Sequence, residues 1–143
     1  MLNRKLFRRA GSTLLVAASV LGLSLVGTQP AQAVGYGGDV TNNLPSSWPV
    51  KIAKFGVGGS HFCNTQNSGS LTCTEYWLPS GQSDSDLRGF WFDTDGFKVE
   101  NVSRYYVSNY GWVPGNVWFR ISDLNKVHCS RVNGSPYCLV DIV

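Results

Sequence analysis

The sequence predicts an all-β protein, a small disulfide-stabilised β-sandwich or barrel of about seven short antiparallel strands. Three observations lead to this fold class. Short segments of alternating apolar and polar residues are separated by glycine, proline, asparagine and aspartate, which favour turns. No segment beyond the first 33 residues repeats apolar side chains with the period of an amphipathic helix. The four cysteines follow an export signal and therefore favour disulfides.

Residues 1–33 have the features of a signal peptide. Four basic residues precede an apolar run from Leu14 to Val26, and the segment ends in Ala-Gln-Ala at 31–33, a pattern that signal peptidases cleave. The apolar run is shorter than the roughly 18–20 residues that span a bilayer. We therefore expect cleavage after Ala33 and a secreted, extracellular protein that has no membrane anchor.

Cleavage changes both the length and the charge of the chain. It leaves 110 of the 143 residues, which suits one domain, with an irregular arm over 34–50 and a single β domain over 51–143. Four of the 12 Lys and Arg residues lie in the signal peptide, so eight remain against nine acidic residues, and the net charge falls from +3 to −1. A near-neutral domain gives no argument for nucleic acid as a partner, and we expect a monomer.

The second pair of cysteines marks a β-hairpin. An Asn-Gly pair at 133–134 favours a type I′ turn, because both residues tolerate positive φ. Strands paired outward from this turn place Cys129 opposite Cys138 at a position whose short Cα separation suits a disulfide. The same register places Lys126 opposite Asp141, a complementary cross-strand pair.

The first pair of cysteines has a similar setting. Residues 67–69, Asn-Ser-Gly, fit a three-residue loop with glycine at the left-handed position. This loop places Cys63 opposite Cys73 and His61 opposite Glu75. Both cysteine pairs are therefore predicted to be disulfides, and their spacings are not those of zinc ligands, so no metal site is expected.

The remaining segments are shorter and end at clear turn signals. Alternation predicts further strands, and the last of them has Val117, Phe119 and Ile121 inward and Trp118 outward. The expected elements are strands over 51–57, 102–107 and 117–121, a polar loop over 79–86, a hairpin over 89–99 with its turn at Asp95-Gly96, and a turn over 113–116 with Pro114 second and Gly115 third.

No catalytic group emerges from the sequence. The chain has two histidines, and a position opposite Glu75 gives His61 an ion pair more readily than the role of a general base. Four aspartates lie close together without the spacing of a calcium loop, and aspartate is an ordinary turn former: Asp84, Asp86, Asp93 and Asp95. The sequence therefore favours a protein without enzymatic activity or cofactor, and leaves a small secreted hydrolase as an alternative.

Aromatic residues are the most unusual part of the composition. Six Phe, six Tyr and five Trp remain after cleavage, and strand alternation separates some of them from the core-facing residues. Exposed aromatic rings stack on sugars or anchor protein partners, although a fold that buries both faces of a strand would use them in its core. The candidate ligand-binding residues are Trp91, Tyr106 and Trp118 on an outer sheet face, with Trp112 and Tyr110 near a turn.

These residues suggest a secreted binding domain that contacts carbohydrate or a cell-envelope polymer through exposed aromatic side chains. The alternative partner is a secreted protein: a loop made rigid by a disulfide would inhibit an extracellular enzyme, either a protease or a glycosidase, because little entropy is left to lose on binding.

Overall fold

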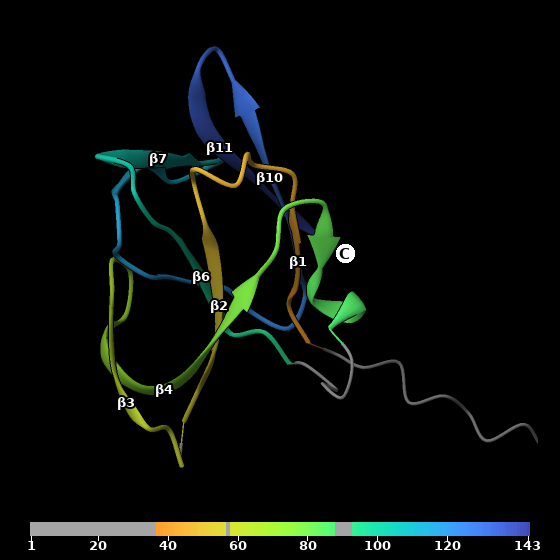
Figure 1. Ribbon diagram of the computed structural model, residues 1–143. Helices are drawn as coiled ribbons and strands as arrows, with labels where there is room; N and C mark the ends of the chain where they lie inside the picture. The colour runs from red at the N-terminus through yellow and green to blue at the C-terminus, as the bar shows by residue number, and fades with distance from the viewer. Residues whose placement is uncertain (1–36, 57, 88–92) are drawn as a thin grey trace, which may run out of the picture. The chain divides into compact units, whose positions relative to one another are not determined.

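The structure, a computed structural model, describes residues 37–56, 58–87 and 93–143. In these residues the chain is almost entirely β, with two sheets, one short 3-10 helix and no α-helix (Figure 1). The elements are β1 (Asp39–Asn42), β2 (Val50–Phe55), β3 (His61–Thr65), β4 (Gly69–Leu78), β5 (Gln82–Ser83), η1 (Asp84–Asp86), β6 (Gly96–Val99), β7 (Arg104–Val107), β8 (Gly111–Pro114), β9 (Phe119–Arg120), β10 (Asn125–Val132) and β11 (Ser135–Ile142). Within the described residues, no helix is long and apolar enough to cross a membrane.

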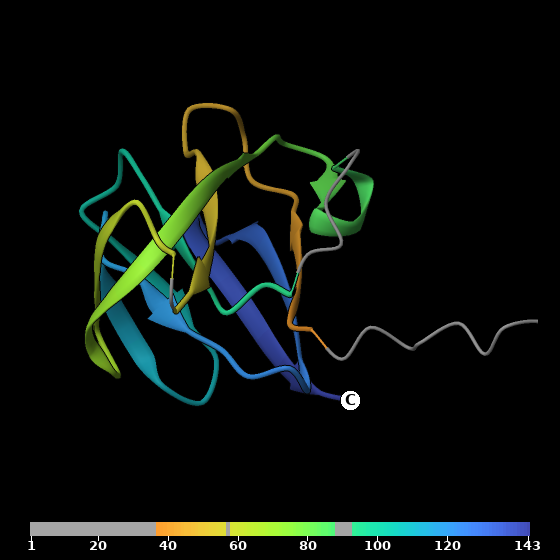
Figure 2. The same cartoon turned by 90° about the horizontal axis from the view of Figure 1, so that it is seen from below.

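The strands form a six-stranded and a five-stranded sheet. The first has the order β5-β1-β10-β11-β7-β8 and the second the order β3-β4-β2-β6-β9, in which the long, curved β4 is prominent in Figure 2. The prediction of antiparallel strands is wrong for two pairs, because β1 runs parallel to β10 and β7 runs parallel to β11. Each of these pairs joins segments far apart in the sequence, where no turn imposes an antiparallel direction.

The N-terminal arm is less irregular than predicted. Residues Asp39–Asn42 form β1, which lies between β5 and β10 in the six-stranded sheet. Val40 on this strand is buried in the core. Its neighbours on the strand are polar, so the sequence shows no alternation of apolar and polar residues there. Asn42 is also buried, and its side chain donates a hydrogen bond to the Leu78 carbonyl oxygen and accepts one from the Leu44 N–H. The prediction of an arm over 34–50 is therefore wrong for this strand.

Side chains from both sheets share the main core. Its aromatic members are Phe97, Tyr105 and Phe119, and the Phe97 ring contacts each of the other two at a centroid distance of 5.9 Å. The Tyr105 hydroxyl donates to the Val117 carbonyl oxygen, so this buried polar atom is satisfied. The aliphatic and sulfur-containing members are Val40, Leu44, Val50, Ile52, Leu78, Val99, Val107, Val113, Ile121, Val127, Cys129 and Cys138.

The β10–β11 hairpin forms as the sequence predicts. Asn133 and Gly134 both have positive φ, 49° and 78°, and Cys129 lies opposite Cys138. The disulfide between these cysteines has a Cα separation of 4.0 Å. The Lys126–Asp141 cross-strand pair is also present in the register. Local turn chemistry therefore determines this hairpin fully.

The β3–β4 hairpin has the predicted disulfide in a different register. Cys63 and Cys73 are bonded at a Cα separation of 5.8 Å, but His61, not Cys63, lies opposite Cys73. The loop begins one residue earlier than predicted because the Thr65 hydroxyl donates to the Gly69 carbonyl oxygen and accepts from the Ser68 N–H. Gly69 thus becomes the first residue of β4, and the disulfide joins diagonal rather than directly opposed residues.

Two glycines have roles other than those predicted. Gly96 does not form a turn: it starts β6 opposite Ala53, and a Cβ there would lie 2.8 Å from the Phe55 ring. Gly115 occupies the second position of a turn that begins at Pro114, and Asn116 takes the positive φ of 64° in its place. A Cβ on Gly115 would lie 1.7 Å from the Val102 carbonyl oxygen, so close backbone approach requires glycine there.

Part of the predicted polar loop over 79–86 is regular. It contains the short strand β5, which pairs with β1, and the 3-10 helix η1. The first strand of the hairpin predicted over 89–99 falls on residues 88–92, which lie outside the described residues.

Candidate binding face

The structure places the five predicted ligand-binding residues in different surroundings. Tyr106 on β7 and Trp112 on β8 lie directly opposite each other on the outer face of the six-stranded sheet. Trp118 is buried, and Tyr110 lies at the turn between β7 and β8. Trp91 lies outside the described residues. Two of the five predicted residues therefore share a surface.

A third aromatic residue, Tyr137, joins Tyr106 and Trp112 on that surface. Tyr137 on β11 lies opposite Tyr106 in the parallel pair of strands, so three adjacent strands each contribute one ring. The Tyr106 and Tyr137 rings are stacked at 5.3 Å with an interplanar angle of 11°. The Trp112 ring meets Tyr106 edge-on at 5.4 Å. We call Tyr137, Tyr106 and Trp112 the aromatic row.

The alternation of β7 and β11 explains why this row points away from the core. Tyr105 and Val107 flank Tyr106 and are fully buried, and Cys138 follows Tyr137 into the same core. Side chains next to each other along a strand point to opposite faces. Sequence reasoning missed Tyr137, although the predicted hairpin register already placed it on the face opposite its disulfide.

Arg104 borders the aromatic row at the Trp112 end. Its guanidinium carbon lies 4.3 Å from the centroid of the Trp112 ring, a cation–π contact. The Trp112 side chain nevertheless keeps 45% of its surface exposed. The row therefore combines accessible aromatic surface with one cation.

Trp118 does not lie on an exposed face, so that expectation is wrong. Strand alternation does direct it away from Phe119, but the side it faces is a second, smaller core formed by Ala53, Cys63, Cys73 and Trp118, and the indole is only 3% exposed. Lys98 covers its ring with the ammonium group 4.8 Å from the centroid. The Trp118 backbone also bonds to β3 and the residue after it, donating to the Asn64 carbonyl oxygen and accepting from the Gln66 N–H. This contact brings together the two edge strands of the five-stranded sheet.

Tyr110 is exposed but separate from the row. Its side chain is 47% exposed, and its ring packs at 4.8 Å against Phe119, which belongs to the five-stranded sheet. The contact holds the β7–β8 turn against that sheet. Tyr110 is therefore about as exposed as Trp112 but does not belong to the aromatic row.

A network of charged side chains lies beside the second core. The hydrogen bond to Glu75 raises the pKa of Lys51, with help from the charge of Glu100 and against partial burial. Burial opposes ionisation of Glu75, but the hydrogen bonds and charges of Lys51 and Lys98 outweigh it and lower its pKa. The ion pairs are Lys51–Glu75 at 2.9 Å, Lys51–Glu100 at 3.4 Å, Lys98–Glu75 at 3.5 Å and Lys98–Glu100 at 2.9 Å. His61 Nε2 lies 3.6 Å from the Glu75 carboxylate, a contact that is an ion pair only when the imidazole is protonated.

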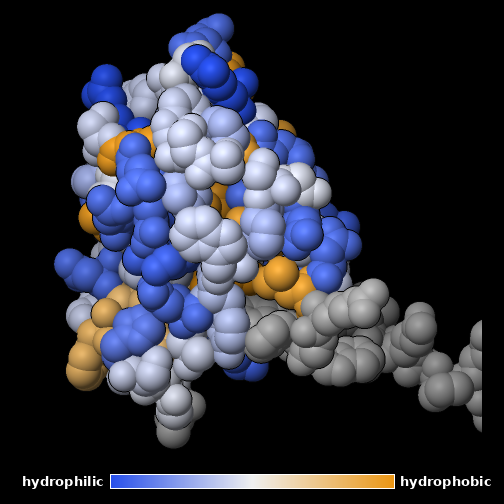
Figure 3. Space-filling view, viewed as in Figure 1, coloured by the Kyte–Doolittle hydropathy of each residue, from blue (hydrophilic) through white to orange (hydrophobic). Residues whose placement is uncertain are grey.

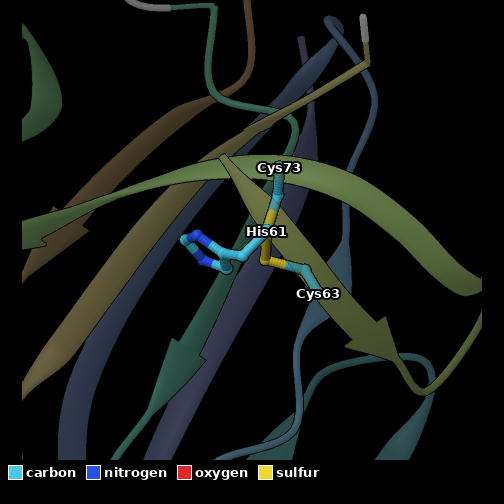
Figure 4. Close-up of side chains that lie close together, drawn as sticks. All are labelled: His61, Cys63 and Cys73. Atoms are coloured by element: carbon cyan, nitrogen blue, oxygen red, sulfur yellow. A yellow bond between two sulfur atoms is a disulfide. The ribbon is translucent and has the colours of Figure 1, made fainter. Parts of the chain in front are cut away.

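His61 lies beside the Cys63–Cys73 disulfide (Figure 4). Ser60 and Glu75 are its polar neighbours. The Ser60 hydroxyl is 2.9 Å from His61 Nδ1, whereas the Glu75 carboxylate is 3.6 Å from Nε2, beyond hydrogen-bond distance. That carboxylate is already held by two lysines. Both sulfur atoms near His61 are in the disulfide and offer no thiolate to a metal. The predicted position of His61 opposite Glu75 is wrong, because His61 lies opposite Cys73, but the two side chains still approach each other to 3.6 Å.

Two groups of acidic side chains lie elsewhere. Carboxylate oxygens of Asp93, Asp95 and Asp123 lie within 4.8 Å of one another, next to a shallow depression of about 610 Å³ between the β3–β4 loop and residues 120–125. One oxygen of Asp95 accepts a hydrogen bond of 2.6 Å from the Phe55 N–H, so this carboxylate already has a structural role. We assign no metal to this group.

The second acidic group is a buried carboxyl pair. Asp84 is only 3% exposed and accepts hydrogen bonds from the Thr94 hydroxyl and the Ser85 N–H. Burial raises the pKa of Asp84 to about 7, and the hydrogen bond and charge of the neighbouring Asp39 carboxyl act in the same direction, whereas the Thr94 hydroxyl opposes the shift. One oxygen of Asp39 is buried without a hydrogen-bond partner.

The face seen in Figure 3 is mainly hydrophilic, with small hydrophobic areas separated by polar side chains. An extended apolar docking surface is therefore not evident in that view. Comparison of the chain with protein-family models, with curated proteins and with solved structures finds no match.

Proposed function

We propose that this protein is a secreted, non-enzymatic binding domain that holds carbohydrate or a cell-envelope polymer against the aromatic row. The observation that carries the proposal is the alignment of Tyr137, Tyr106 and Trp112 on three adjacent strands, on the face opposite the core. Rings fixed on strands form a rigid surface, so little side-chain entropy is lost when a sugar stacks on them. The two disulfides are compatible with an extracellular location.

We also infer that the two sheets are the two layers of a β-sandwich. The inference is supported by the shared core, to which both sheets contribute buried side chains. Such an arrangement leaves the outer face of the six-stranded sheet available to a ligand.

The test is retention of the mature protein by immobilised polysaccharides, followed by titration of those that retain it. Trp112→Ala is expected to weaken binding about fivefold, since loss of one aromatic contact costs on the order of 1 kcal/mol. Tyr106→Ala removes the ring that contacts both other members and should weaken binding at least as much.

Trp77→Ala provides the matched control. Trp77 is a tryptophan of similar exposure, 51%, on the five-stranded sheet, and its loss should leave binding unchanged. The proposal is wrong if none of the polymers retains the protein, or if loss of Trp77 weakens binding as much as loss of Trp112.

Inhibition of an extracellular enzyme is a second proposal, supported by the rigidity of the β3–β4 loop. The Asn67 side chain accepts a hydrogen bond from the Arg120 N–H and donates one to the Arg120 carbonyl oxygen, and Thr65 makes two bonds within the loop. Assays against secreted proteases and glycosidases test it, and a panel without inhibition would count against it.

A further inference from the structure

We propose that the polymer bound by the aromatic row is anionic, a glycan whose acidic groups bind the Arg104 guanidinium. This inference rests on the proposed function and adds the chemical class of the ligand. It depends on three features of the outer face: how Arg104 is held, what its donors are left to bind, and where the carboxylates of that face lie.

Arg104 is held by an aromatic ring rather than by an acid. Its guanidinium lies over Trp112 at 4.3 Å. Within the described residues, the ion pairs belong to Lys51, His61 and Lys98 with Glu75 and Glu100, and none involves Arg104. The positive charge at the end of the row is therefore not neutralised by a protein carboxylate at contact distance in this part of the chain.

The indole lies beneath the guanidinium carbon and accepts no conventional hydrogen bond from it. The five N–H donors of a guanidinium lie in its plane and match the two oxygens of a carboxylate, sulfate or phosphate. The same contact covers one face of the Trp112 ring, which reduces the bare aromatic surface that a neutral sugar would use. Arg104 therefore favours a sugar that carries an anion.

The acidic residues of the outer face lie at its far end. Lys126 on β10 lies opposite Asp39 on β1 and opposite Asp141 on β11, so each of these acidic residues has a lysine on the neighbouring strand. The Asp39 carboxyl is in addition partly buried beside Asp84. Asp141 is four residues along β11 from Tyr137, roughly 13 Å at the rise of a β-strand. The aromatic row and Arg104 thus form the part of the face that suits an anion.

The experiment compares polymers that differ only in charge. Wild-type protein is titrated with polygalacturonate and with its fully methyl-esterified form, and with dextran sulfate and dextran. We expect the acidic member of each pair to bind about tenfold or more tightly, because hydrogen bonds to charged groups are the strong ones. The affinity for the acidic polymers should fall as salt is raised.

Variants then assign the effect to one guanidinium. Arg104→Gln should reduce binding of each acidic polymer to the level of its neutral partner, while Arg104→Lys, which keeps the charge without the planar fork, should retain part of it. Arg131→Gln is the matched control, since Arg131 also stacks on a tryptophan, Trp48, at 5.4 Å but lies outside the row. The Arg131→Gln variant should bind the acidic and the neutral polymers with the affinities of wild type.

The outcomes separate this inference from the proposed function. Equal binding of acidic and neutral polymers, or an Arg104→Gln variant that binds as well as wild type, overturns the anionic ligand and leaves the aromatic row as a site for neutral glycans. Binding to none of the four polymers or any other polysaccharide overturns the proposed function itself. Tighter, Arg104-dependent binding of a single-stranded oligonucleotide overturns the assignment to glycans. The comparison of esterified and free polymers uses wild-type protein only, so it holds even if a variant folds poorly.

Discussion

Trp118→Ala is expected to lower the free energy of unfolding by about 3–5 kcal/mol, the usual cost of removing a large buried aromatic side chain. The indole is nearly fully buried beside Ala53 and the Cys63–Cys73 disulfide, and Phe55 meets it edge-on at 6.3 Å. Its removal leaves a cavity in the second core and uncovers one side of Lys98. The effect is therefore on the fold and not on a ligand.

Urea denaturation measures this change. Unfolding is monitored by far-ultraviolet circular dichroism of the backbone, so that the loss of a tryptophan does not remove the signal. Trp77→Ala, a half-exposed tryptophan in the same sheet, is the control and should cost under about 1 kcal/mol. The folded fraction of Trp118→Ala should still bind the polymers that wild type binds. A variant that is as stable as wild type but has lost polymer binding would show that Trp118 is a ligand contact after all.

The second large effect is a loss of stability between pH 5 and pH 8 that depends on Asp84. The pKa of Asp84 is raised to about 7 in the folded protein, chiefly by burial, against an ordinary value of 3.8. Between these values the folded state keeps a proton that the unfolded state has released. The stabilisation is therefore complete below the ordinary pKa and is lost as the pH rises through the folded pKa, by about 3 kcal/mol from pH 5 to pH 8.

Asp84→Asn should remove most of this pH dependence, because a neutral amide mimics the protonated acid at every pH. The groups that face Asp84 are the Asp39 carboxyl and the Thr94 hydroxyl, and Lys126 lies opposite Asp39 on β10. Glu75 acts in the opposite sense, because its pKa is lowered in the folded protein. Its contribution to stability is lost only as the pH falls below 4.5, the ordinary pKa of a glutamate. Burial also raises the pKa of Asp95, so only the difference between wild type and Asp84→Asn assigns the change to Asp84.

The measurement is the difference in unfolding free energy between wild type and Asp84→Asn at pH 5 and at pH 8. We expect the variant to gain stability relative to wild type as the pH rises. Asp141→Asn, an exposed carboxylate on β11, is the control and should show no such trend. Parallel pH profiles for wild type and Asp84→Asn would contradict a protonated Asp84 in the folded state.

Local features of the sequence predicted the parts of the fold that depend on neighbouring residues. The register of the β10–β11 hairpin follows from an Asn-Gly turn and two cysteines only nine positions apart, and the structure has that register throughout. The β3–β4 hairpin shows the limit of such reasoning, because one side chain, Thr65, closes the loop a residue early and shifts the register while leaving the disulfide in place.

The candidate site divides in the same way. Alternation correctly placed Tyr106 away from the core, and it also directed Trp118 away from Phe119. Alternation gives the direction of a side chain but does not show whether another segment covers that side of the strand. Trp118 is buried because β3, more than 50 positions earlier in the sequence, approaches it, whereas no comparable segment among the described residues buries Trp112. Tyr137 joins the row through a parallel strand pair that no local turn specifies.

The sequence alone therefore determined the all-β class, both disulfides and the sides of their strands to which Tyr106 and Trp118 point, because backbone alternation and tight turns depend on residues close in the chain. It also identified the export signal, which remains a prediction. Only the tertiary structure decided which of those side chains are covered, that residues near Val40 form a strand, and that Arg104 lies over Trp112. These outcomes depend on pairing between distant strands, whose energies come from contacts that no short segment contains.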